Sequence, residues 1–300
     1  MNKLFRGGDW HVCFRERQNE NCIFEPDSPF VVVPNPSDGW IADPFLVQMG
    51  GRLFLFAEYF IFSKEKGTIG VSEYMDGDFS PIRIVIEEAF HLSYPVVFSY
   101  DDSFYMIPES GQGGRIGLYR SKNFPYEWEF VVELVGDGNY ADTTLTKNED
   151  GVIELVSYQK ERNRFKIHLI EFSLVDMDTI SHTSFFYDEN YCRPGGLPLT
   201  IDGELLIPVQ DCREKYGNSL GFFAFDHTAE YATRGPLYVL DINSISLESK
   251  ITVQRIHTFN SAGRFEVIDV FEEHFDLLHA PKMLRRRIRT ALFRLRGRSR

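Results

Sequence analysis

The sequence lacks the features of an exported or membrane-spanning protein. No stretch approaches the roughly 18–20 consecutive apolar residues of a transmembrane helix. The N-terminus, MNKLFRGGDW, becomes polar early and does not form the apolar segment of a signal peptide. The cysteines are few (Cys13, Cys22, Cys192 and Cys212) and show no C-x-x-C spacing. Without an export signal they are expected to be free buried thiols, and the predicted location is cytoplasmic.

Basic residues are scarce outside the C-terminus. The 300 residues carry a net charge of −12, although residues 281–300 contain nine Lys or Arg and no acid, so the rest of the chain is more acidic still. A nucleic-acid-binding domain needs a basic face for the phosphates, so no nucleic-acid partner is predicted. The histidines show no ligand spacing, and no metal or cofactor is predicted.

Aromatic residues are abundant, with 27 Phe and 14 Tyr, and they favour β-strands. The stretch from Trp40 to Glu58 reads as a hairpin in which two apolar runs flank the turn Gly50-Gly51. No segment before residue 280 has a convincing helical period. The sequence therefore predicts an all-β protein.

The hairpin recurs along the chain. Its copies begin at Asp43, Tyr94, Asp142 and Arg193, about fifty residues apart, and a weaker fifth copy covers Thr258–Asp269. Such a period, with about four short strands in each unit, is typical of propeller blades. We predict a five-bladed β-propeller over residues 40–275, with residues 1–39 as a lead-in that closes it by adding to the last sheet. The alternative is a pair of β-sandwiches.

The C-terminal segment, residues 280–300, has a different character. Leu284, Ile288, Leu292 and Leu295 follow a helical spacing among arginines. This pattern predicts a short basic amphipathic helix that binds an anionic membrane surface, which would make the protein peripheral at the inner membrane face. The alternative is a solvated basic tail or one docked on the acidic body.

In a propeller, the start of each first strand and the end of each second strand face one mouth of the central channel. The residues predicted at this mouth are Asp43, Glu58, Tyr94, Glu109, Asp142, Arg193, Gln210, Asp211 and His257. Several acids in one pocket raise one another's pKa values, an arrangement that acid–base chemistry uses.

We predict Asp43, Glu109 and Asp142 as catalytic residues, because two carboxylates that flank a bond can cleave a glycoside. The other mouth residues, together with Trp40 and Tyr216, are predicted to bind substrate, with the aromatic rings as flat surfaces for sugars. The structural alternative is that these acids cap turns and join blades.

The box Ala42-Asp43-Pro44-Phe45, within hairpins of this period, resembles the five-bladed propeller glycosidases, such as glycoside hydrolase families 43 and 117. The resemblance implies that Asp43 is a general base. In those families the second blade supplies an Asp and the third a Glu, whereas this chain has Tyr94 and Asp142 there. This departure puts plain hydrolysis in doubt.

A second resemblance rests on an ordered series of motifs: HLSYPVVF (91–98), MIPES (106–110), LYRSKNFPYEW (118–128), ADTTL (141–145), RPGG (193–196), PVQDCREKYG (208–217) and IHTFN (256–260). They resemble the propeller domain found N-terminal in plant glucosamine inositolphosphorylceramide transferases and in stand-alone bacterial relatives. In the plant proteins the recognised transferase domain is a separate one, which this chain lacks.

Together these observations favour a carbohydrate-active enzyme that transfers a glycosyl group in surface polysaccharide or glycolipid synthesis. Asp43 would be the base on the acceptor hydroxyl, with Glu109 or Asp142 as the acid or as a ligand of sugar hydroxyls. Two alternatives remain open: a glycoside hydrolase of the family 43 type, and a non-catalytic glycan-binding propeller.

Overall fold

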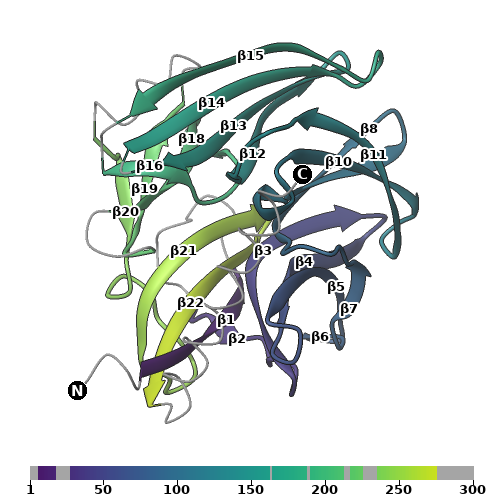
Figure 1. The fold of residues 1–300 in the computed structure, drawn as a ribbon. Helices are drawn as coiled ribbons and strands as arrows, with labels where there is room; N and C mark the ends of the chain where they lie inside the picture. Colours follow the sequence, from purple (N-terminus) through teal and green to yellow (C-terminus); the bar gives the residue numbers. More distant parts are fainter. Residues whose placement is uncertain are drawn as a thin grey trace.

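The computed structural model describes residues 6–17, 28–162, 164–187, 190–212, 217–225 and 235–275. In these ranges the chain forms five antiparallel sheets that surround a common centre, which confirms the predicted all-β, five-bladed propeller (Figure 1). The basic tail at 280–300, with its predicted helix, and Tyr216 lie outside the described residues. Among the residues described, no helix is long and apolar enough to cross a membrane.

The first three blades each follow the chain from the centre outward. Blade 1 contains β3 (Gly39–Met49), β4 (Arg52–Ile61), β5 (Lys66–Met75) and β6 (Asp78–Phe79), and β7 (Arg83–Ile86) also pairs with β5. Blade 2 contains β8 (Ser93–Tyr100), β9 (Ser103–Glu109), β10 (Ile116–Asn123) and β11 (Glu127–Val135). Blade 3 contains β12 (Tyr140–Glu149), β13 (Val152–Glu161), β14 (Arg164–Ser173) and β15 (Asp178–Tyr187).

The last two blades are less regular. Blade 4 contains β16 (Tyr191–Pro194), β18 (Glu204–Asp211), β19 (Leu220–Ala224) and β20 (Tyr238–Leu240), and β17 (Leu199–Ile201) also pairs with β18. Blade 5 contains β21 (Val253–Ala262), β22 (Phe265–Phe275), β1 (Arg6–Glu16) and β2 (Val31–Val32).

The N-terminal segment thus belongs to the last blade. Strand β1 pairs with β22 over its whole length, from Arg6 opposite Phe275 to Glu16 opposite Phe265. Figure 1 shows the purple β1 beside the yellow β22, next to β3 of blade 1. The strands at the two ends of the described chain therefore share one sheet, and eleven residues of strand pairing join them to close the ring.

The central hairpins turn where the sequence predicts. The tight turns contain two consecutive residues of positive φ, which suits the right-handed twist of the strands they join. These pairs are Gly50-Gly51, Asp101-Asp102, Asp150-Gly151 and Asp202-Gly203.

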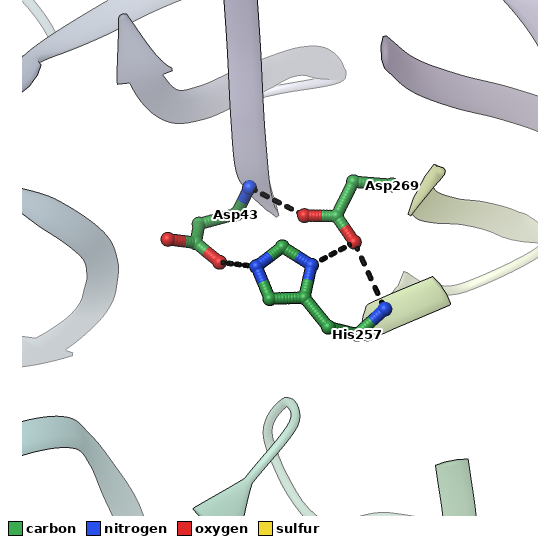
Figure 2. A group of neighbouring side chains, drawn as sticks. All are labelled: Asp43, His257 and Asp269. Atoms are coloured by element: carbon green, nitrogen blue, oxygen red, sulfur yellow. Dashed lines mark hydrogen bonds and ion pairs between the residues drawn. The ribbon is translucent and has the colours of Figure 1, made fainter. Parts of the chain in front are cut away.

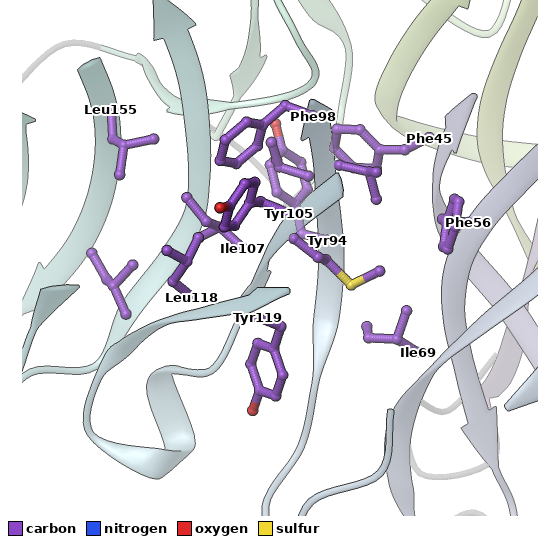
Figure 3. Packing of buried hydrophobic residues seen from close by; sticks show 14 of the residues in the cluster. Phe45, Phe56, Ile69, Tyr94, Phe98, Tyr105, Ile107, Leu118, Tyr119 and Leu155 are labelled. Atoms are coloured by element: carbon purple, nitrogen blue, oxygen red, sulfur yellow. The ribbon is translucent and has the colours of Figure 1, made fainter. Parts of the chain in front are cut away.

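The largest core cluster lies where blades 1, 2 and 3 meet (Figure 3). Phe45 of blade 1 packs against Tyr94 of blade 2, and Phe56 of blade 1 and Leu155 of blade 3 belong to the same cluster. Tyr94 is fully buried, and its ring meets that of Phe45 edge to face, with centroids 4.8 Å apart. Burial of such aromatic rings between sheets fixes the blades that carry the candidate site.

Candidate functional site

A β-bulge recurs near the start of the innermost strand in four blades. The pairing with the second strand skips two residues between Ala42 and Phe45, Ser93 and Val96, Ala141 and Thr144, and Ile256 and Phe259. Each bulge begins with a residue predicted at the mouth: Asp43, Tyr94, Asp142 and His257. Bulges of this kind turn side chains out of the regular pleat and are common beside functional sites.

Three of these bulge residues adopt a left-handed backbone conformation. The φ angles are 50° at Asp43, 45° at Tyr94 and 47° at Asp142. For residues other than glycine this conformation costs of order 1–3 kcal/mol each. The same strained conformation at one place in three blades shows that the surrounding structure imposes it on different side chains.

The first cluster joins blades 1 and 5 (Figure 2). The His257 imidazole lies between two buried carboxylates: its Nε2 is 3.2 Å from Asp43 Oδ1 and its Nδ1 is 2.7 Å from Asp269 Oδ1. The Asp43 backbone N–H donates to Asp269 Oδ2 at 2.8 Å, and the Thr258 hydroxyl donates to Asp43 Oδ1 at 3.0 Å. The indole of Trp10 stacks on the imidazole, with ring centroids 3.9 Å apart.

These contacts set the charges of the cluster. Burial disfavours the imidazolium, but Asp269 and Asp43 outweigh this effect and raise the pKa of His257 to about 10. Burial also opposes ionisation of Asp43, but the charge of His257 and its hydrogen bond lower the pKa of this carboxyl. The pKa of Asp269 is raised, by burial first and also by Asp43, against the opposing charge of His257.

The Asp43, His257 and Asp269 side chains each offer a ligand atom, and these atoms lie within 4.8 Å of one another, close enough to hold a metal ion. A metal would require His257 to lose its proton. Because the pKa of His257 is about 10, the imidazolium itself supplies the positive charge between the two carboxylates.

The second cluster joins blades 2, 3 and 4. Arg193 binds Asp142 through two nitrogens, Nε to Oδ2 and Nη2 to Oδ1 (2.9 Å), and Nη2 also lies 3.3 Å from Glu109 Oε2. The Gln210 amide donates to Asp142 Oδ2 at 2.8 Å, and the Asp142 backbone N–H donates to Glu109 Oε2 at 3.1 Å. Both carboxylate oxygens of Asp142 therefore already accept hydrogen bonds, and the bidentate arginine fixes the orientation of this carboxylate.

Glu109 differs from Asp142 in two ways. Its side chain is 19% exposed, whereas that of Asp142 is 1% exposed. Burial, together with the charges of Asp142 and Asp43, raises the pKa of Glu109 well above the usual value despite the opposing charge of Arg193. The raised pKa favours the protonated form of Glu109, and the side chain reaches solvent.

A third contact lies beside the first cluster. Glu58 is buried, and its pKa is raised well above the usual value by burial and by the charges of Asp43 and Glu109. Its Oε1 is 3.3 Å from His91 Nε2, and His91 Nδ1 accepts the Gly67 N–H at 3.0 Å. Because Nδ1 is an acceptor, the proton of a neutral His91 resides on Nε2 and faces Glu58.

Tyr94 lies below these acids. Its hydroxyl lies 2.8 Å from Thr144 Oγ1 in blade 3, and its backbone N–H donates to Asp43 Oδ2 at 3.3 Å. A fully buried side chain of this kind links blades 1, 2 and 3. Tyr94 thus contacts Asp43 of blade 1 and Thr144 of blade 3, and its predicted role in substrate binding stays a prediction.

The remaining predicted residues are more scattered. Trp40 is half-buried and stacks on Phe60, with centroids 4.6 Å apart. Asp211 is buried and lines a polar cavity of about 480 Å³ with Tyr191, Asn218 and other residues between blades 4 and 5. Neither Trp40 nor Asp211 is hydrogen-bonded to the two acid clusters in the contacts described above.

Sequence reasoning missed Asp269, Thr258 and His91 as site residues. Asp269 closes the second strand of the fifth hairpin, as Glu58 does in the first hairpin and Glu109 in the second. Comparison of the repeats could therefore have found it. His91 precedes its blade and has no repeat equivalent that would have identified it.

The site can be compared with known proteins. A family profile described as glucosamine inositolphosphorylceramide transferase 1, N-terminal, matches residues 29–235. Two curated relatives, both named glucosamine inositolphosphorylceramide transferase 1, are 30% identical: one from Oryza sativa subsp. indica over 226 residues, the other from Arabidopsis thaliana over 237. These alignments cover 70% and 66% of this chain but only 30% and 31% of the relatives, so the chain spans about a third of their length.

Solved structures share the fold at low sequence identity. An α-L-arabinofuranosidase from Podospora anserina, in complex with cellotriose, matches 81% of this chain and 95% of its own, with a TM-score of 0.55 and 13% identity. A β-1,2-mannobiose phosphorylase from Listeria innocua matches 91% and 99%, with a TM-score of 0.52 and 11% identity. At these identities the likeness concerns the fold alone.

Proposed function

Because this chain belongs to the family of the N-terminal domain of glucosamine inositolphosphorylceramide transferase 1, we propose that it is a carbohydrate-active propeller. We assign it the transfer of a glycosyl group in surface polysaccharide or glycolipid synthesis. The mouth formed by Asp43, Glu58, Glu109 and Arg193 is the proposed site. A sugar or glycan is the proposed substrate.

The state of Glu109 is the observation that carries this proposal. A carboxyl group with a raised pKa that is 19% exposed and lies beside Asp142 and Arg193 is the group that general acid catalysis requires. In the proposed step Glu109 gives its proton to the leaving oxygen as the bond from that oxygen to the anomeric carbon breaks. The acceptor hydroxyl forms the new bond and gives its proton to Asp43.

The hydrogen bonds of Asp43 indicate which oxygen takes that proton. Oδ1 is bonded to Thr258 and His257, whereas Oδ2 accepts the Tyr94 N–H at 3.3 Å. Oδ2 therefore keeps a lone pair for the acceptor. The lowered pKa keeps Asp43 ionised over a wide pH range, although it also makes Asp43 a weaker base.

The test is an assay of the full chain with a panel of nucleotide-activated sugars and hydroxyl acceptors. We expect transfer to fall at least ~100-fold in Glu109→Gln, the usual scale of general acid catalysis. Glu129→Gln is the matched control. Glu129 lies on the outer strand β11, forms an ion pair with Lys122 of β10 and is 46% exposed. Transfer that survives in both Glu109→Gln and Asp43→Asn would refute the assignment.

The same assay separates the two alternatives. A family 43 type hydrolase would release reducing sugar from aryl glycosides without any nucleotide sugar. The bidentate hold of Arg193 on Asp142 argues against that mechanism, because both oxygens of the third-blade carboxylate are engaged by Arg193 and not directed at a substrate. A non-catalytic glycan-binding propeller is favoured by the number of acids already engaged in internal ion pairs, and it predicts saturable sugar binding that survives Asp43→Asn with Glu109→Gln.

We also propose that the protein works in the cytoplasm, at the inner membrane face, with residues 281–300 on an anionic lipid surface. The nine basic residues of this segment and its spaced leucines support the proposal. This position would bring the mouth near lipid-linked acceptors.

A further inference from the structure

Two cysteines far apart in the sequence meet beside the second cluster. Cys192 lies in β16 and Cys212 directly follows β18, and both belong to the apolar cluster between blades 3 and 4 that includes Tyr158 and Tyr187. Both are free thiols. Because β16 and β18 are paired antiparallel and both residues belong to this cluster, the two thiols are neighbours, and each affects the ionisation of the other.

The strand pairing explains this proximity. Tyr191 lies opposite Asp211 and Arg193 lies opposite Gln210, so Cys192 falls at an irregularity between the two pairs. The Cys212 N–H then donates to the carbonyl of Asn190 at 3.0 Å. Cys212 is therefore held at the end of the same two-strand ladder that carries Cys192.

The two thiols differ in access and in acidity. Cys192 is fully buried, whereas Cys212 is half-buried and reaches solvent. The interaction with Cys192 and the charge of Arg193 lower the pKa of Cys212, whereas the interaction with Cys212 and burial raise the pKa of Cys192. An accessible thiolate beside a buried partner is the arrangement of an attacking and a resolving cysteine.

We propose that Cys212 and Cys192 form a reversible dithiol–disulfide couple that a small-molecule disulfide oxidises, with Cys212 as the attacking and Cys192 as the resolving residue. The Cys212 thiolate attacks one sulfur of oxidised glutathione, which forms a mixed disulfide and releases one glutathione thiolate. Cys192 then attacks the Cys212 sulfur, and its proton goes to the second departing glutathione. Two protein thiols are oxidised and one glutathione disulfide is reduced to two thiols.

The couple lies next to the acid clusters. Cys192 directly precedes Arg193, and Cys212 follows Gln210 by two residues. The side chains of Arg193 and Gln210 both donate hydrogen bonds to Asp142. The disulfide would cross-link β16 and β18, the two strands that carry Arg193 and Gln210. The inference is independent of the proposed function, because it concerns the thiols alone.

The test is oxidation of the native full chain with oxidised glutathione, followed by alkylation, proteolysis and mass spectrometry. We expect one peptide pair joined through Cys192 and Cys212 that disappears on reduction. Cys13, which is fully buried in blade 5, should remain a thiol and react with the alkylating reagent only after unfolding. Glutathione retained on Cys212 without the joined peptide, a joined peptide with any other cysteine, or a pair formed only after unfolding would each overturn the inference.

Variants assign the two roles. In Cys192→Ser, Cys212 should accumulate as the stable glutathione mixed disulfide, whereas in Cys212→Ser the reaction of residue 192 should slow at least tenfold. Cys13→Ser is the control that should leave the joined peptide unchanged. Equal glutathionylation of both single variants would contradict the assignment of the two roles. If a variant folds poorly, the peptide map of the oxidised wild type still decides whether Cys192 and Cys212 form the disulfide.

Discussion

Replacement of His257 by Gln tests whether the imidazolium between Asp43 and Asp269 holds blades 1 and 5 together. Glutamine keeps a hydrogen-bonding amide of similar reach but carries no charge. Both carboxylates would then lose their buried positive partner, and at least one would have to take up a proton. We expect His257→Gln to lower the free energy of unfolding strongly at neutral pH.

The magnitude follows from the pKa of His257. Its rise from 6.5 to about 10 corresponds to ~5 kcal/mol, at 1.36 kcal/mol for each pKa unit. Loss of one partner from a buried ion pair generally costs ~3–5 kcal/mol. Both routes predict a loss of about 3–5 kcal/mol, which is a large fraction of the ~5–15 kcal/mol stability of a typical domain.

The pH dependence gives the sharper test. Because the pKa of His257 is raised in the folded state, the folded protein binds more protons than the unfolded chain between pH 6.5 and about 10. The stabilisation is complete below pH 6.5 and is lost as the pH rises towards 10. The difference in stability between wild type and His257→Gln should therefore shrink steadily across this range.

His168 provides a control within the same protein. It is also buried, but burial and the neighbouring His182 lower its pKa to about 4. The unfolded chain therefore binds the extra proton, and stability is lost as the pH falls from 6.5 towards 4. The difference in unfolding free energy between wild type and His168→Gln should therefore change with pH only below about pH 6.5.

Urea unfolding from pH 5 to pH 10 measures both difference curves. If His257→Gln does not fold, the imidazole proton resonances of the wild type still report the titration of His257 directly. A His257→Gln variant within about 1 kcal/mol of wild type at pH 7, or a His257 that titrates near pH 6.5, would refute the ion-pair reasoning.

Three further predictions concern other parts of the molecule. Tyr94→Phe removes the hydroxyl bonded to Thr144 and should cost ~1 kcal/mol in urea unfolding, since the buried ring remains in place; a cost above ~3 kcal/mol would show that the hydroxyl has a larger role. Gly67→Ala should cost ~1–3 kcal/mol, because its Cβ would lie 2.4 Å from the Leu92 carbonyl oxygen; an unchanged unfolding midpoint would contradict this packing. Replacement of Arg285, Arg286 and Arg287 by Gln should weaken co-sedimentation with phosphatidylserine vesicles by about 100-fold, since each of the three charges contributes ~1 kcal/mol. Equal binding would exclude an electrostatic anchor.

The fold was predictable because each blade repeats one local signal. The turn residues Gly50-Gly51 and Asp202-Gly203 can adopt the positive φ angles that a tight hairpin needs, and apolar runs flank them. The structure places these turns where the sequence predicts. The fifth copy is weaker in the sequence because β1 and β2, from the other end of the chain, supply its outer strands.

The membership of the site was more predictable than the state of its groups. The position of an acid at a strand end follows from the repeat, so Asp43, Glu109 and Asp142 could be placed near one another. Their ionisation depends on which cation each meets, and the bulges that decide this have no distinct sequence signal. Asp142 is bound by Arg193, whereas Glu58 meets only the imidazole edge of His91.

The balance of charge explains why neighbouring acids differ. Five carboxyl groups gather here (Asp43, Glu58, Glu109, Asp142 and Asp269), but the contacts described place only Arg193 and His257 among them as cations at neutral pH. Arg193 makes two hydrogen bonds to Asp142 and one longer contact to Glu109, and His257 lies between Asp43 and Asp269. The carboxyl groups therefore outnumber the cations in these contacts, and burial together with the neighbouring negative charges raises the pKa values of Glu58 and Glu109 well above the usual value. This surplus gives one mouth carboxyl groups of different acidity.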